Sequence, residues 1–465
     1  MNRRSFLKST AGILLSASAT SGAYPLQFQR NNSERPNILL ISTDQQFAGT
    51  MSCAGNADLH TPAMDSLAAK GVRFEKVYCA QPLCVPSRVS MFSGRHPHEA
   101  GAPYNRSDEP DSVQGPLLGK ILKDAGYSTG YVGKWHMGIP PSQKELHGFD
   151  YMNSIRNNRV DFDIPAGCEE FLQQKHDQPF LLVASFVNPH DICEFARGQA
   201  LKNGEIPWPP PPEECPELPA NFEIPEHEPS IIREQQLRSF RTYPTLYWKD
   251  ELWRTYRWAY NRMTEMVDGY IGQVLDSLEN SKYAENTVII FTSDHGDGYG
   301  AHKWNQKQVL YEESARVPFI IVDQNKTNQG EVNPNELINT GLDLIPTLCD
   351  YADVPIPEHL KGKSIKPAVD DPDRPSKQDH IVIETEFCGF NEPYGIKGRC
   401  VRSEKFKYIV YNQGEQREQL FNMENDPGEM QNLAVLSSYS QILSDHQNLL
   451  QQWMQDTDDA FKLRD

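Results

Sequence analysis

The sequence predicts an α/β protein: a large mixed, mainly parallel sheet sandwiched by helices, followed by a smaller C-terminal α+β subdomain. Apolar runs recur between helical patterns, and within each run the hydrophobic residues are continuous rather than alternating. Continuous hydrophobicity is typical of strands buried on both faces, as in a parallel sheet that helices cover on both sides. The five runs cover residues 37–42, 129–132, 180–186, 287–292 and 317–322.

Two helices can be delimited between these runs. Thr61 and Pro62 favour the start of a helix, and Gly71 favours its end. A second, long amphipathic helix follows from apolar residues at positions 253, 256, 260, 263, 267, 270, 274 and 278. We expect both helices to cover the sheet and to have no chemical role.

Residues 190–245 interrupt the pattern of strands and helices. The stretch PWPPPPEECPELP within them excludes a helix or a central strand, because proline lacks a backbone donor and restricts the residue before it. We expect a long surface excursion that flanks the functional site. A plain connector is an equally open alternative.

A second break, DDPDRPS at residues 370–376, divides the chain. Beyond it come shorter strand-like runs, HIVIETEF and KFKYIVY, and then a helical tail. This order predicts a small antiparallel sheet packed with a helix. We therefore expect a main domain over residues 35–370 and a C-terminal subdomain over residues 371–465.

The first 23 residues have the pattern of an export signal rather than of a membrane span. Arg3 and Arg4 precede a short apolar run at residues 13–15, and an Ala-Ser-Ala cleavage pattern follows at residues 17–19. Paired arginines before Ser-Phe-Leu-Lys are typical of the twin-arginine type of signal. The sequence thus predicts a periplasmic or secreted bacterial protein, with a disordered basic tail as the alternative.

Composition narrows the function classes. Lys and Arg number 45 against 63 Asp and Glu, so the net charge is -18 and a general nucleic-acid-binding surface is not expected. Any anionic substrate must be held by a local cluster of cations. The nine cysteines contain no C-x-x-C pair, so neither a zinc ribbon nor a dense disulfide framework is predicted.

Polar side chains follow four of the predicted strands where each strand ends. In an open α/β sheet a ligand binds beyond the carboxyl ends of the strands. Oxygen-rich ligands at such an edge suit a hard divalent cation, calcium before magnesium, although histidine is an unexpected ligand for calcium. The residues are Asp44 and Gln45, Lys134 and His136, Asn188 and His190, and Asp294 and His295.

The stretch LCVPSRVSMFSGRHP, residues 83–97, places a thiol at the start of a predicted helix. Pro86 fits the first helical turn without losing a needed donor, and Arg88 follows one turn after Cys84. A helix N-terminus and an arginine both stabilise negative charge on the side chain at that position. Cys84 is therefore the cysteine that we expect to have a chemical function.

The motifs CVPSR and SGR (residues 84–88 and 93–95), GKWHMG and SDHGDGYGAHKW occur in an order that resembles the type I sulfatases, relatives of alkaline phosphatase. The similarity spans roughly residues 35–435. It implies an alkaline-phosphatase-like fold and a sulfate ester hydrolase. It also implies that a maturation enzyme oxidises Cys84 to formylglycine.

The resemblance assigns roles residue by residue. Arg88 matches the residue that steadies the modified side chain and the metal site. The matching metal ligands are Asp44, Gln45, Cys84, Asp294 and His295. The residues matching those that hold the sulfate and serve the leaving oxygen are Lys134, His136, His190, His302 and Lys307. Gln45 and His295 depart from the Asp and Asn of many relatives, and the general acid stays open between His136 and His302.

The modification has a chemical reason. A thiolate is a poor nucleophile toward a sulfate ester, whereas one hydroxyl of an aldehyde hydrate can attack sulfur and the other can then expel the sulfate. The alternatives are a phosphate or phosphonate monoester hydrolase of the same superfamily, and a non-catalytic glycan-binding relative whose cysteine stays a thiol. The intact CVPSR motif and the retained lysines favour the sulfatase.

The expected substrate is a sulfated carbohydrate cleaved at chain ends through a narrow pocket. Export and an acidic surface are compatible with an extracellular sulfated sugar. Candidate pocket walls, besides the excursion after His190, are residues 385–402 and a set of polar side chains that follow the cysteine segment. The set is His98, Tyr104, Asn105 and Arg106.

Overall fold

The computed structural model describes residues 35–105, 113, 115–153, 160–238, 245–326, 328–389 and 392–463. The predicted export signal and Arg106 lie outside these residues. Among the described residues, no helix combines the length and the apolarity needed to cross a membrane.

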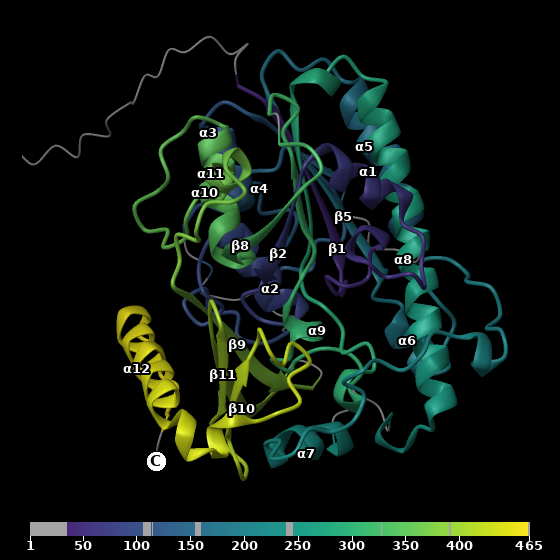
Figure 1. Ribbon diagram of the computed structural model, residues 1–465. Helices are drawn as coiled ribbons and strands as arrows, with labels where there is room; N and C mark the ends of the chain where they lie inside the picture. Colours follow the sequence, from purple (N-terminus) through teal and green to yellow (C-terminus); the bar gives the residue numbers. More distant parts are fainter. Residues whose placement is uncertain are drawn as a thin grey trace, which may run out of the picture. The chain divides into compact units, whose positions relative to one another are not determined.

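An eight-stranded sheet forms the centre of the main domain (Figure 1), with the strand order β4-β3-β5-β1-β6-β7-β2-β8. All neighbouring strands are parallel except the two pairs that β7 makes with β6 and β2. The mixed, mainly parallel sheet is thus confirmed. Its strands are β1 (Asn37–Asp44), β2 (Val72–Tyr78), β3 (Ser128–Gly133), β4 (Tyr151–Asn153), β5 (Phe180–Pro189), β6 (Thr287–Ser293), β7 (Phe319–Val322) and β8 (Glu331–Asn339).

The five apolar runs all became strands, but β2, β4 and β8 were not predicted. In β2, buried and half-buried residues interchange, and β4 has only three residues, all half-buried. Strands of this kind carry no continuous apolar run, because one of their faces is partly open. The criterion that found the central strands therefore missed the strands toward the edges.

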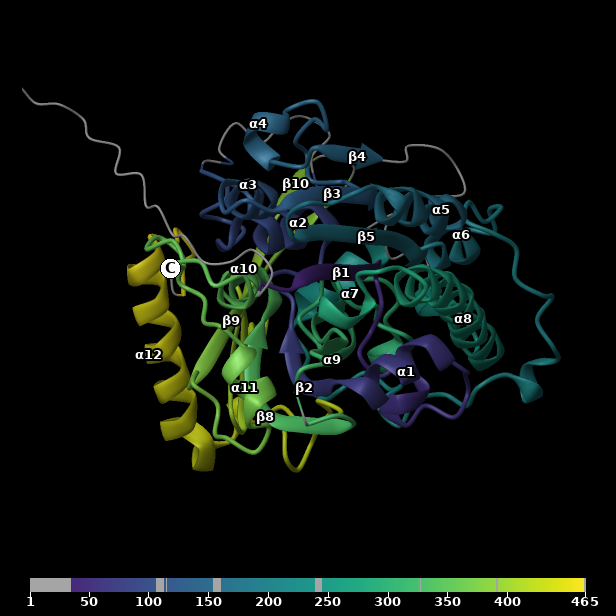
Figure 2. The same cartoon turned by 90° about the horizontal axis from the view of Figure 1, so that it is seen from above.

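Helices cover both faces of the sheet (Figures 1 and 2), as predicted. Apolar side chains on one face pack against α1 (Pro62–Lys70), α5 (Val160–Gln173) and α8 (Asp250–Glu279). The opposite face packs against α2 (Cys84–Ser93), α3 (Leu118–Asp124), α10 (Thr340–Tyr351) and α11 (Lys366–Asp370). The two helices delimited from sequence are α1 and α8.

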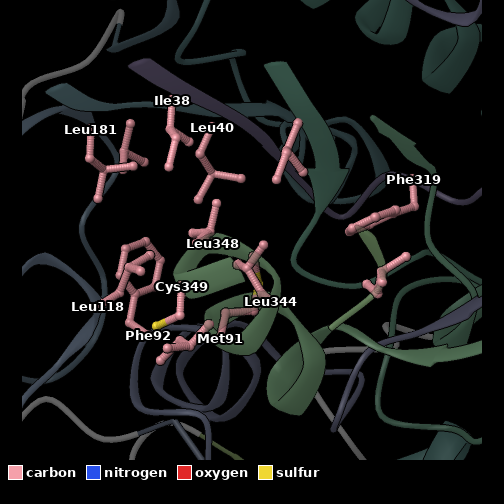
Figure 3. Close-up of a cluster of buried hydrophobic side chains, with 14 of the residues drawn as sticks. Ile38, Leu40, Met91, Phe92, Leu118, Leu181, Phe319, Leu344, Leu348 and Cys349 are labelled. Atoms are coloured by element: carbon pink, nitrogen blue, oxygen red, sulfur yellow. The ribbon is translucent and has the colours of Figure 1, made fainter. Parts of the chain in front are cut away.

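The alternation of side chains along β1 explains the two cores. Ile38 and Leu40 point to the α2 and α10 side, where they meet Leu344 and Leu348 (Figure 3), whereas Leu39 and Ile41 belong to the cluster on the opposite face. Successive residues of a strand face opposite sides of the sheet, so a strand covered twice must be apolar throughout.

The excursion after β5 is not devoid of structure. It contains α6 (Ile192–Ala196) and α7 (Ser230–Arg238), and Cys215 and Phe222 pack against aromatic residues of α8. The proline-rich part itself forms no α-helix or strand, as expected. The two remaining short helices are α4 (Lys144–His147) and α9 (Glu312–Ala315).

The C-terminal part forms a second sheet, which is antiparallel and has the order β12-β11-β10-β9 (Figure 1). Its helix packs against the face of the sheet that carries Val401 and Tyr408. This confirms the predicted small antiparallel sheet with a helix, while the boundary at residue 370 stays a prediction. The elements are β9 (His380–Cys388), β10 (Pro393–Ser403), β11 (Phe406–Tyr411), β12 (Glu418–Asn422) and α12 (Ser440–Thr457).

A buried histidine joins α12 to the segment after α2. His96 is 3% exposed, and the Trp453 indole donates to its Nε2 over 3.1 Å. Burial lowers the pKa of His96 to about 4, despite the opposing charges of Glu384 and Glu99. The ring is therefore neutral at pH 7 in the folded protein.

We predict that His96 makes the fold sensitive to acid. The pKa of this histidine is 6.5 in the unfolded chain and about 4 in the folded protein, so the unfolded chain takes up the proton first as the pH falls. The free energy of unfolding is therefore fully retained above pH 6.5 and decreases as the pH falls toward 4. At pH 5 the loss amounts to about 2 kcal/mol. Chemical denaturation at pH 7 and pH 5 should show a smaller decrease for His96→Gln than for the unaltered chain. The exposed His60→Gln serves as the control, and equal decreases in all three proteins would contradict the prediction.

Candidate active site

Two carboxylates meet at the carboxyl ends of neighbouring central strands. β1 and β6 pair in parallel with Thr43 opposite Ser293, so Asp44 and Asp294 leave the sheet side by side. The pairing of β1 with β5 shifts register between Ser42 and Asp44. Such an irregularity redirects a side chain at the end of a strand. Both aspartates are fully buried.

Cys84 is the first residue of α2, and its thiol lies against these strand ends. Its Sγ is 3.2 Å from His295 Nε2 and 3.9 Å from Asp44 Oδ1. One ligand atom from each of Asp44, Cys84, Asp294 and His295 lies within 4.8 Å of the others. The chain thus brings together four of the five predicted metal ligands in a space that fits one ion.

Arg88 connects the two carboxylates. Its Nε donates to Asp294 Oδ2 over 2.8 Å, and its Nη2 donates to Asp44 Oδ2 over 3.2 Å. Nη1 donates to Ser185 Oγ at 2.8 Å and to the Lys134 carbonyl oxygen at 3.0 Å. The Arg88 side chain is 2% exposed, and its four hydrogen bonds connect the ends of β1, β3 and β6.

Two lysines add positive charge around the thiol. Lys307 Nζ is 3.0 Å from Cys84 Sγ, and Lys134 forms an ion pair with Asp44. Burial tends to raise the pKa of the Cys84 thiol, but Lys307, Lys134 and His295 outweigh burial and hold the pKa well below its usual value. The position therefore stabilises an anion at the end of this side chain.

The same cations act on the Asp44 carboxyl. Burial and the Cys84 charge favour its neutral form, yet Lys134, His190 and Arg88 hold its pKa well below the ordinary range. Asp44 is an anionic oxygen donor as a result.

The ring of His295 is oriented by a backbone carbonyl. Nδ1 lies 2.8 Å from the oxygen of Gly296, which only accepts, so Nδ1 carries the hydrogen. In the neutral ring Nε2 then keeps its lone pair, and this atom points at Cys84. The backbone carbonyl of Gly296 thus fixes the tautomer that a metal ligand needs.

Gln45 lies beside the cluster, with its amide already engaged. Its Oε1 accepts from Lys307 Nζ at 2.8 Å, and its Nε2 donates to Asp297 Oδ2 at 2.7 Å. The Tyr256 hydroxyl also donates to Asp297, at 2.9 Å. Gln45 and Asp297 therefore position Lys307. Asp297 lies three residues after Asp294 in SDHGD, and sequence analysis did not identify it as part of the site.

His136 and His190 border the thiol from two other strand ends. Both interact electrostatically with the Cys84 side chain. His190 is half-buried, and burial together with Lys307 and Lys134 lowers its pKa to about 4. His136 is exposed and follows Lys134 at the end of β3. The structure thus brings both predicted histidines to the site.

His302, which the resemblance placed in the catalytic set, has no contact with Cys84 among the interactions of the described residues. Its ring stacks on Tyr311, with ring centroids 4.0 Å apart, and its charged neighbours are Arg233 and Lys407. His302 has a backbone φ of 54°, so the chain turns there between the end of β6 and Lys307. The spacing of the motifs in the sequence does not show this turn. Of the two predicted histidines beside Cys84, His136 is exposed and His190 is half-buried.

The predicted substrate-binding residues have different surroundings. His98 Nδ1 is 2.7 Å from Glu384, and its Nε2 is 3.1 Å from the Thr457 carbonyl oxygen, so both ring nitrogens are engaged. Asn105 is buried, and its Oδ1 accepts from the backbone of Val85 at 3.0 Å. Asn105 therefore supports the first turn of α2. Tyr104 is half-buried in the same loop, and Arg106 lies outside the described residues.

The donor set fits a divalent cation. It offers carboxylate oxygens and one imidazole nitrogen, and the fourth donor is the side chain at position 84. With an oxygen in place of the thiol sulfur there, the set becomes one of oxygens and a single nitrogen, which favours a hard cation over a soft one.

Comparison with known proteins agrees with this geometry. A family model described as "Sulfatase" matches residues 36–354, and one described as "N-sulphoglucosamine sulphohydrolase, C-terminal" matches residues 300–456. A Delta 4,5-hexuronate-2-O-sulfatase of Bacteroides thetaiotaomicron is 30% identical, with 92% of this chain and 91% of that protein covered.

Solved structures share the whole fold. The structure of a 2-O GAG sulfatase has a TM-score of 0.80 at 29% identity, covering 92% of this chain and 93% of that one. A phosphonate monoester hydrolase of Agrobacterium radiobacter has a TM-score of 0.74 at 21% identity over 91% and 96% of the two chains, a likeness of fold alone. Because the sulfatase model matches more than half of the sequence, the chain belongs to the sulfatase family and is a sulfuric ester hydrolase.

Proposed function

We propose that this sulfatase removes sulfate from the ends of a sulfated glycan, with formylglycine formed from Cys84 and with calcium as its metal. The observation that carries the proposal is the buried cluster of Asp44, Cys84, Asp294 and His295, with Arg88 between the two carboxylates. When present, the modified side chain and the ion supply an oxygen nucleophile that is ionised at neutral pH.

The chain's own cations would bind the sulfate. Negative charge grows on the sulfonyl oxygens and on the leaving alkoxide during transfer, and Lys134 and Lys307 stand on either side of the thiol to meet it. Fixed donors in a site shielded from water cost no reorganisation when the charge appears. Removing one such contact typically costs ~3 kcal/mol, or a hundredfold in rate.

His136 is the proposed general acid. It is exposed at the rim, whereas His190 is half-buried and has a pKa of about 4, which leaves it unprotonated at neutral pH. Desolvation and Lys134 lower the pKa of His136 as well, so the choice of His136 rests on its exposed position, where it can take up a proton from solvent. His190 would instead donate or accept a hydrogen bond at the sulfate without titrating.

The substrate would be a sulfated carbohydrate. The sulfatases similar to this chain are named for a hexuronate 2-O-sulfate and for a GAG. Two segments border the site: the loop of Tyr104 and Asn105 joined to α2, and the end of β9, where Thr385 and Cys388 bond to Gln308 beside Lys307. The proposal of exo action after export to the periplasm or beyond rests on these two bordering segments, which would limit access to a chain end.

The alternatives give different results with the same probes. A phosphonate or phosphate monoester hydrolase would cleave phenyl phosphonate or a sugar phosphate faster than the sulfate ester. A non-catalytic glycan-binding relative would bind a sulfated oligosaccharide without releasing sulfate. The intact CVPSR motif and the retained Lys134 and Lys307 favour the sulfatase over both.

The first prediction from this proposal concerns Cys84. Chain made with a maturation enzyme should lose about 18 Da in the peptide that contains Cys84, because an aldehyde oxygen replaces the thiol. Cys84→Ala should release no sulfate from a panel of sulfated saccharides, while its circular dichroism spectrum is unchanged. The buried Cys168→Ala, on α5, is the matched control. Full sulfate release by Cys84→Ala would refute the proposal.

The second prediction concerns the metal. Elemental analysis of the mature protein should find one calcium per chain, and a chelator should abolish sulfate release until calcium is restored. Asp294→Asn should lose the ion, because an amide contributes no charge to the site. If the protein contains one magnesium instead, the metal is magnesium and not calcium. Full activity without any divalent metal would refute the metal site.

The third prediction separates the general acid from the sulfate-binding groups. His136→Ala should slow a sugar sulfate, whose alkoxide is a poor leaving group, by 10²–10⁴-fold. Nitrophenolate leaves without a proton, so the hydrolysis of a nitrophenyl sulfate should slow far less in this variant. Lys307→Ala, which removes a sulfate contact, should slow both substrates alike. Equal losses on the two substrates in His136→Ala would contradict its role as the acid.

A further inference from the structure

A second group of metal-binding side chains lies apart from the active site. One ligand atom from each of His302, Glu313 and Glu429 lies within 4.8 Å of the others, as expected for ligands of one ion. His302 belongs to the turn between β6 and Lys307, Glu313 to α9, and Glu429 to the turn that follows β12. The cluster thus joins the main domain to the C-terminal sheet.

His302 is the observation that indicates a ligand. Its side chain is fully buried, and within the described part of the chain neither ring nitrogen has a hydrogen-bond partner. A buried polar atom without a partner costs free energy and calls for an explanation such as an ion or a water molecule. Arg233 and Lys407 are the cations that act on the ring, and each is paired with a carboxylate.

Glu313 and Glu429 provide the oxygen ligands. Burial raises the pKa of Glu313, and that of Glu429 to about 8, so binding of an ion would release protons from them. Lys407 Nζ is shared by Glu312, at 2.9 Å, and Glu429, at 2.8 Å. Glu313 accepts from the Asn221 amide at 2.9 Å through one oxygen, and its other oxygen has no hydrogen-bond partner among the described residues. Glu313 forms no ion pair within that part of the chain either. One carboxylate is therefore left without a cation in a buried acidic group.

The cluster lies beside a cavity. Glu313 and Ala301, the neighbour of His302, line a cavity of about 270 Å³ that also contacts Pro219 and Arg257. The number of ligands favours a different ion from that of the active site. Calcium takes more ligands, mainly oxygens, than these three side chains offer, whereas a zinc-type dication is held by three or four ligands that commonly include an imidazole.

We propose that His302, Glu313 and Glu429 form a second metal site, which takes a transition-metal dication of the zinc type. The ion would fasten the segment that carries Lys307 to the C-terminal sheet. The ligands come from three sequence-distant segments, so the site forms only in the folded chain, and binding would stabilise the fold. This site does not rest on the sulfate ester chemistry of the active site.

Equilibrium dialysis of the full chain against Zn²⁺ tests the proposal. The parent is Cys84→Ala, which lacks the thiol of the active site, and excess calcium keeps zinc away from the remaining ligands there. After stripping with a chelator, His302→Ala and Glu313→Gln should each bind one zinc per chain fewer than this parent. The parent's melting temperature should rise with zinc, and that of the two variants should not. His227→Ala and Glu223→Gln change exposed residues nearby and should match the parent.

A second measurement needs no variant at the proposed site. Crystals of the same parent soaked in zinc should give an anomalous peak, at the zinc absorption edge, between His302, Glu313 and Glu429. Equal zinc content in the parent and in His302→Ala would overturn the proposal. A water molecule at that position, with no anomalous signal, would overturn it as well.

Discussion

The ion pairs of Arg88 with Asp44 and Asp294 are the interaction on which the active site depends. Two buried carboxylates side by side repel each other and lose their hydration, and a single guanidinium directed at both compensates for these costs. Arg88 is part of α2, so the same contacts fix the first turn of the helix that carries Cys84. Arg88 therefore both neutralises the two carboxylates and positions Cys84, the proposed source of the nucleophile.

The layered fold makes this arrangement possible. All ten residues of α2 are buried, and its apolar side chains belong to one cluster with those of the sheet and of α10. The strand ends that meet its N-terminus belong to the sheet's most buried strands, β1, β5 and β6. Rigid, doubly covered strands hold the ligands in place, while the loops and the C-terminal sheet around them are free to define the substrate.

The central features could be predicted from sequence because each has a local signature. The runs that became β1, β5 and β6 are continuous in hydrophobicity. The last residue of β1, Asp44, and the two residues after β6, Asp294 and His295, form the cluster with Cys84. His302 was assigned to the site from the resemblance of its motif. The sequence did not show that the chain turns there with a positive φ. The support of Lys307 by Gln45 and Asp297 was also invisible, because buried hydrogen bonds depend on tertiary geometry.

We propose that the reaction takes place on the side chain at position 84, where the surrounding cations stabilise an oxygen anion. The most direct test of this proposal varies one quantity, the fraction of chains oxidised at that position, by changing the amount of maturation enzyme during expression. Sulfate release per milligram of protein should then rise in proportion to the aldehyde fraction measured by peptide mass spectrometry, along a line through the origin. Substantial sulfate release from protein with no detectable aldehyde would contradict the account.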